Sequence, residues 1–119
     1  MPDTFTIPTV EEAQRLWLPA HDLASLAFDD NRHRSGHSLT PVKRMINVLA
    51  DRGLLAFEKV GEGRTHPLLY SLAGAVRLRV FAELIRDGRT YADAAPVADA
   101  AEEQLLQVLR RAKDWDHFN

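Results

Sequence analysis

The sequence predicts a mainly α protein with a small two-stranded β-hairpin near its middle. Apolar residues recur with helical spacing in several segments whose ends are marked, most clearly over 41–52 and 74–87. The stretch LLAFEKV alternates roughly as a strand does, and the glycine turn GEGRT joins it to a second apolar run, HPLLYSL. No internal repeat and no long linker interrupts this order.

The N-terminal forty residues are expected to form two short helices and a polar loop. Thr9 and Glu12 have the spacing of a capping box, so a helix should run from about residue 10 to 18. Pro19 ends that helix or starts the next one. The stretch DDNRHRSGH (29–37) contains no apolar residue and is typical of a loop. The buried side of the second helix is expected to comprise Leu23, Leu26, Ala27 and Phe28.

A third helix, 41–52, has the clearest start and stop signals in the chain. Thr40 can cap it, and Pro41 suits the first position because the missing N–H would be unpaired there anyway. Gly53 suits the left-handed position just after a helix. The predicted buried stripe has spacing i, i+3, i+4, i+7 and comprises Val42, Met45, Ile46 and Leu49.

The hairpin and the C-terminal helices come next. Pro67 removes a backbone donor, so the second strand is expected at a sheet edge. The hairpin should pack on the helices through Leu55, Phe57, Leu69 and Tyr70. A helix over 74–87 ends at Gly88, a short helix is cut by Pro96, and 97–115 form the last helix. We therefore divide the chain into a domain of 1–95 and a C-terminal helical segment, 96–119.

Composition and charge narrow the class of protein. The chain has no cysteine, which excludes disulfides and thiolate metal sites. We find no signal peptide and no apolar stretch of the ~20 residues that span a bilayer, so we expect a soluble cytoplasmic protein. Eleven Lys and Arg against five acids give residues 32–89 a charge of +6, whereas 1–31 carry −5 and 90–119 carry −3. A basic middle favours a polyanionic partner, although chance clustering in a short chain is the alternative.

Three helices and then a hairpin is the order of a winged helix-turn-helix, in which the third helix reads DNA and the hairpin forms the wing. The run LTPVKRMINVLADRGLLAFEKVGEGRTHPLLYSL resembles the recognition helix and wing of bacterial winged-helix regulators. The next stretch, YSLAGAVRLRVFAELIRDGRTYADAA, is similar to the segment after the wing in the MerR family. The resemblance covers about 38–95. The forty preceding residues and the short C-terminal helix depart from that family's pattern.

This resemblance implies a sequence-specific transcriptional regulator that binds double-stranded DNA. Helix 41–52 would lie in the major groove and the wing, 55–72, at the minor groove. Base contacts would come from Lys43, Arg44 and Asn47, because Arg and Lys pair with guanine and Asn with adenine. Phosphate and wing contacts would come from Ser38, Thr40, Lys59, Arg64, Thr65, His66, Arg32, Arg34 and His37.

Each of these residues also has an ordinary interpretation. Lys43, Arg44 and Asn47 fit a solvated helix face, and Thr40 caps a helix in either case. Arg64 at a turn can serve solubility alone, and Arg32 and Arg34 fit a disordered loop. Arg77, Arg79 and Arg86 are expected to be solvated or salt-bridged, although Arg77 and Arg79 lie early enough in their helix to touch phosphate.

The remaining expectations concern assembly and chemistry. The last helix either folds back on its own domain or pairs with a second copy, with a seam of Leu105, Leu109, Ala112 and Trp115. Trp17 is expected to anchor a core or an interface. Of the five histidines, His33 and His37 have i, i+4 spacing but fall in loop sequence, so we expect no metal site, and no catalytic motif points to an enzyme or a cofactor. A regulator would associate with the nucleoid and with a protein partner such as RNA polymerase. The rival interpretation is a winged-helix protein-interaction module that does not bind DNA.

Overall fold

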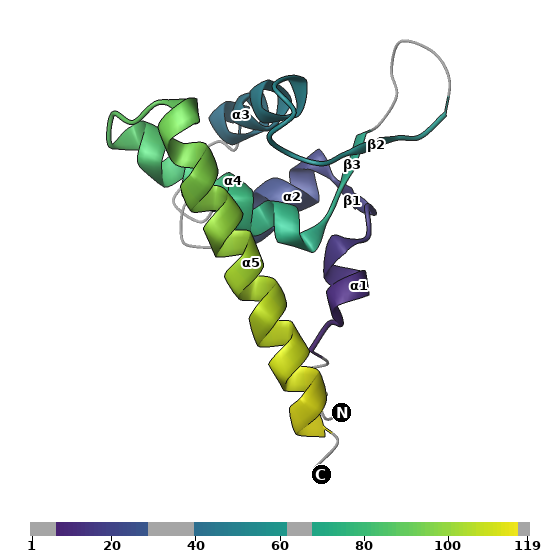
Figure 1. The fold of residues 1–119 in the computed structure, drawn as a ribbon. Helices are drawn as coiled ribbons and strands as arrows, with labels where there is room; N and C mark the ends of the chain where they lie inside the picture. The colour runs from purple at the N-terminus through teal and green to yellow at the C-terminus, as the bar shows by residue number, and fades with distance from the viewer. Residues whose placement is uncertain (1–6, 29–39, 62–67, 117–119) are drawn as a thin grey trace.

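The computed structural model describes residues 7–28, 40–61 and 68–116; the side chains of residue 40 and of 113–116 are not described. The chain is mainly helical with a small antiparallel sheet, which confirms the prediction of a mainly α protein (Figure 1). The elements in chain order are α1 (Val10–Gln14), β1 (Leu18–Pro19), α2 (Ala20–Ala27), α3 (Thr40–Asp51), β2 (Glu58–Lys59), β3 (Leu68–Tyr70), α4 (Leu72–Arg86) and α5 (Tyr91–Asp116).

Helix α1 starts as predicted but is shorter than expected. The Thr9 hydroxyl accepts from the Glu12 amide at 3.1 Å, and a Glu12 carboxylate oxygen accepts from the Thr9 amide at 3.3 Å. This completes the capping box. The helix ends at Gln14 because Arg15 takes an extended conformation, with ψ of 136°. The chain is thereby free to enter the sheet at Leu18.

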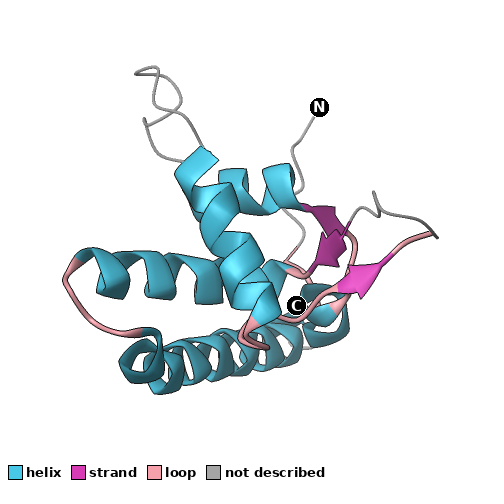
Figure 2. Ribbon diagram, turned by 90° about the horizontal axis from the view of Figure 1, so that it is seen from above, coloured by secondary structure: helices cyan, strands magenta, loops and turns pink. Residues whose placement is uncertain are grey.

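The sheet has three strands rather than the predicted two, in the order β1-β3-β2. Tyr70 pairs with Leu18 on one side of β3, and Leu69 faces Glu58 on the other. The expectation that the strand after Pro67 lies at an edge was therefore wrong. Pro67 itself lies outside the described residues, and β3 is described from Leu68 onward. The three strands lie together at one side of the helical body (Figure 2).

The main core lies between α2, α3, α4 and the first half of α5. The predicted stripe of α3 is confirmed, with Ile46 and Leu49 fully buried and Val42 and Met45 partly buried. On α2 the prediction was wrong at one position, because Leu26 is 49% exposed. The largest fully buried side chains of this core are Leu23, Phe28, Ile46, Leu49, Leu55, Tyr70, Leu78 and Phe81.

The C-terminal helices pack tightly against each other and form a continuous part of the fold. Helix α4 begins two residues earlier than predicted, because the Ser71 hydroxyl caps it by accepting from the Gly74 amide at 3.0 Å. The predicted break at Pro96 was wrong, since α5 is a single helix from Tyr91 to Asp116. Proline removes one backbone hydrogen bond there. The fully buried Ala94 and Ala98 hold the flanking turns on the core. The boundary proposed at 95/96 thus falls inside one helix.

A smaller second core joins the two ends of the chain. Ala13 of α1 is fully buried against Leu106 and Leu109 of α5, and Val10, Leu72 and Leu105 pack around them. In Figure 1, α1 accordingly lies near the C-terminal half of α5, at the end of the molecule away from α3. The long helix α5 therefore spans from the main core to this second one.

Candidate nucleic-acid interface

The outward face of α3 presents the three residues that the sequence singled out for base contacts. Lys43, Arg44 and Asn47 are all exposed, whereas Ile46 and Leu49 on the opposite side are fully buried. Positions 43, 44 and 47 are three and four apart, so their side chains share one helix face. The first turn of α3 holds no acidic residue. This face is therefore cationic and can both donate and accept hydrogen bonds.

The end of α3 is closed by its own backbone. Gly53 has φ of +72°, as the sequence predicted, and its amide donates to the Ala50 carbonyl at 3.1 Å. The Leu54 amide donates to the Leu49 carbonyl at 2.8 Å, which completes a Schellman motif. These bonds set the direction in which the chain leaves α3 toward β2. The hairpin's position relative to α3 is fixed at this turn.

A partly buried arginine supports the same turn. Arg77 of α4 donates from Nε to the Leu54 carbonyl at 2.9 Å, and its Nη1 lies 2.7 Å from Asp99 and 3.0 Å from Glu102, both on α5. Its side chain is only 13% exposed. Arg77 therefore ties α4, α5 and the end of α3 together. Of the roles weighed for it, the salt-bridged one is confirmed.

Arg79 has a comparable role at the end of α2. Its Nη1 donates to the carbonyl of Ala27, the last residue of α2, at 3.0 Å. Its Nε pairs with Glu83 at 3.0 Å, and the guanidinium lies 4.9 Å from the centre of the Phe28 ring. A cation at a helix C-terminus also interacts favourably with the helix dipole. Arg77 thus joins α4 to α5 and to the end of α3, and Arg79 joins α4 to the end of α2.

The hairpin contributes one described cation. Lys59 is exposed on β2, and its backbone is opposite Leu68 of β3. Beside it, Phe57 and Val60 are 37% and 45% exposed. Leu55 and Tyr70 do pack into the core as predicted, but Phe57 lies largely outside it. Arg64, Thr65 and His66 lie outside the described residues.

Several candidate contacts in the loop before α3 and at the start of that helix lie outside the described residues. Arg32, Arg34, His37 and Ser38 fall in 29–39, outside the described residues. Thr40 is the first residue of α3, and nothing is described of its side chain. Of the twelve candidate DNA contacts, the structure therefore gives the exposure of Lys43, Arg44, Asn47 and Lys59.

The proposed dimer seam on α5 is partly occupied within the chain itself. Leu109 is only 6% exposed because it packs on Ala13, and Leu105 packs partly against the same cluster. Ala112 is half-buried, and nothing is described of the Trp115 side chain. Val97 and Val108, which the sequence analysis did not assign to the seam, are 48% and 58% exposed. They share a side of α5 beside its buried face, since they are three turns apart.

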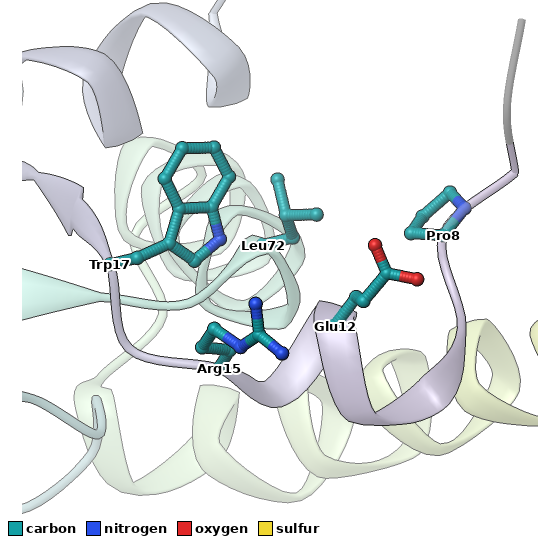
Figure 3. A pocket seen from close by; sticks show the side chains of 5 residues that line it. All are labelled: Pro8, Glu12, Arg15, Trp17 and Leu72. Carbon is teal, nitrogen blue, oxygen red and sulfur yellow. The ribbon is translucent and has the colours of Figure 1, made fainter.

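Trp17 differs most from its expected surroundings. It lies between α1 and β1, and the residue is 51% exposed. It lines an open pocket of about 350 Å³ together with Pro8, Glu12, Arg15 and Leu72 (Figure 3). The sequence offered no signal for this pocket, because its walls come from α1, the turn after it and the distant start of α4.

Comparisons with protein-family models, curated proteins and solved structures found no significant match. Among the described residues, no three metal-ligating side chains come together. Nor is any described helix both long and apolar enough to cross a membrane.

Proposed function

We propose that the protein binds double-stranded DNA and regulates transcription on the nucleoid, with α3 in the major groove and the hairpin at the minor groove. The observation that best supports this proposal is the exposed face of Lys43, Arg44 and Asn47 on a helix whose opposite stripe is buried. A helix of this width fits the major groove, and the N-terminal half of a recognition helix is the part that reaches base edges.

The chemistry of each side chain suggests its role. Arg44 and Lys43 can pair with guanine O6 and N7 or contact phosphates, and Asn47 can bond an adenine through both the oxygen and the nitrogen of its side-chain amide. Each good base contact discriminates by about 1–3 kcal/mol. Lys59 on β2 would contact backbone phosphate. The Arg77 contacts to Leu54 and α5 keep the hairpin at a fixed place beside α3.

A dimer would match a palindromic site and double the contacts. The exposed side of α5 that carries Val97 and Val108 supports a seam there, beside the Leu105 position proposed from the sequence. Replacing Val108 with glutamate tests this proposal, since the side chain is exposed and the fold should tolerate a charge. Sedimentation should show a dimer that dissociates in the variant; a mass unaffected by the change would reject this seam.

The decisive experiment is selection of bound sequences from a random DNA pool, and then anisotropy titrations of the selected site. Lys43→Ala with Arg44→Ala should weaken binding by at least tenfold. The slope of the logarithm of the binding constant against the logarithm of the salt concentration should become less steep by about two or less, as expected when up to two phosphate contacts are lost. The matched control removes two cations from α5, Arg110→Ala with Arg111→Ala, and should change little. Equal losses in both variants would mean that only net charge matters, and the α3 assignment would fail.

A second candidate function is a protein-docking module. It is favoured by the exposed Phe57 and Val60 next to Lys59, because apolar side chains on a hairpin suit a protein partner better than phosphate. Absence of any DNA retardation at low salt would reject the DNA proposal and leave this one. Steep salt dependence together with an enriched sequence would reject docking as the primary role.

A further inference from the structure

The pocket around Trp17 has the size and the lining of a small-ligand site. Its volume of about 350 Å³ lies within the range of ligand pockets. Pro8 and Glu12 form one side, Trp17 and Leu72 the other, and Arg15 projects between them (Figure 3). It lies on α1 and the edge of the sheet, away from the α3 face.

The aromatic wall of this pocket is held in place by the sheet. The Trp17 amide donates to the Tyr70 carbonyl at 2.9 Å, and the next residue, Leu18, pairs with Tyr70 in the ladder. Trp17 is nevertheless half exposed, and its indole nitrogen lies on the edge turned toward Leu72 and the pocket. A large ring on a fixed backbone loses little freedom when a ligand packs on it.

The pocket also offers one available cation. Arg15 is exposed, and none of the ion pairs among the described residues involves it. Glu12 lies across the pocket on the Pro8 side, where one carboxylate oxygen is engaged by the Thr9 amide. The positive group beside the indole is therefore free to pair with an incoming anion, and a guanidinium binds a carboxylate through two parallel hydrogen bonds.

We infer that this pocket binds a small organic monoanion with a flat apolar body. The apolar body packs on Trp17 and Leu72, and the carboxylate pairs with Arg15. This inference does not depend on the proposed DNA binding, since none of the five lining residues belongs to α3 or the hairpin.

The test uses the full-length ¹⁵N-labelled protein and the probe 2-naphthoate, with its neutral amide, 2-naphthamide, as the matched ligand. The indole N–H signal of Trp17 is assigned with Trp115→Phe. Naphthoate should shift that signal saturably, and the amide should bind at least about tenfold more weakly, as expected for loss of a charge-assisted hydrogen bond. No saturable shift, or equal affinity for the two probes, overturns the inference.

Three variants locate the binding within the pocket. Arg15→Gln should weaken naphthoate at least about tenfold and leave the amide unaffected, whereas the control Arg89→Gln, on the distant α4–α5 turn, should bind both normally. Glu12→Gln keeps a side chain that suits the capping box and should bind naphthoate as well as or better than the wild type. If Arg15→Gln binds naphthoate normally, or Arg89→Gln loses it equally, the ligand lies elsewhere and the proposed site is wrong.

Discussion

Replacing Arg77 with alanine should lower the free energy of unfolding by about 2–4 kcal/mol, and the structure shows where this loss comes from. The bond from Nε to the Leu54 carbonyl has a charged donor and a side chain that is 13% exposed, which is worth about 1.5–3 kcal/mol. The Glu102 pair, 28% exposed on the acid side, adds about 0.5–1 kcal/mol. Asp99 is 70% exposed, so water screens its pair and we assign it almost nothing.

Urea unfolding monitored by circular dichroism measures this loss. Arg77→Lys keeps the charge, but one ammonium cannot reach all three acceptors, so it should recover about half of the loss. Arg110→Ala is the matched control, because its pair with Glu103 is 3.4 Å long and both partners are more than half exposed. It should cost less than about 0.5 kcal/mol. The reasoning is refuted if Arg77→Ala and Arg110→Ala unfold at the same urea concentration.

Three further predictions concern local features. Thr9→Ala removes the capping hydroxyl of α1 and should raise hydrogen exchange at the Ala13 amide about fivefold, for a loss of about 1 kcal/mol; unchanged exchange would contradict the role of the cap. Burial, and secondarily the charge of Asp51, raises the pKa of Tyr70 above its ordinary value of 10.0. The folded protein thus holds that proton more tightly, and stability should fall as the pH rises above about 10, less steeply in Tyr70→Phe; equal slopes in urea titrations at pH 9 to 11 would exclude it. Gly88→Ala forces a side chain into φ of +91° and should cost about 1–2 kcal/mol, seen as a lower thermal midpoint; no shift would mean that the turn relaxes.

The parts of the fold that could be predicted from sequence are those whose causes lie within a few residues. The capping box of Thr9 and Glu12, the stripe of α3 and the left-handed Gly53 each depend on near neighbours, and all three are confirmed. The exposed face of α3 has its origin in the same periodicity. For that reason Lys43, Arg44 and Asn47 could be placed on the surface without coordinates.

The parts that could not be predicted depend on distant partners. Strand β1 has only two residues, too few to show an alternation, and it exists because Tyr70 lies beside it. Pro96 would end an isolated helix, but buried alanines on both sides hold the two flanking turns in place. Arg77 has acceptors on two other elements that no spacing in the sequence indicates. The Trp17 pocket likewise needs Leu72, which is remote in the chain.

The packing of Ala13 on Leu106 and Leu109 has a consequence for the order of folding. During synthesis, α2, α3, the hairpin and α4 can assemble once the first half of α5 has emerged, because among the described residues the main core extends no further along α5 than Ala98. The packing site for α1 is incomplete until the second half of α5 is made, because Leu106 and Leu109 supply its buried side chains. The first helix translated should therefore be the last to dock, closing a loop that spans most of the chain. We expect α1 and the end of α5 to open together, as one unit, well before the main core unfolds.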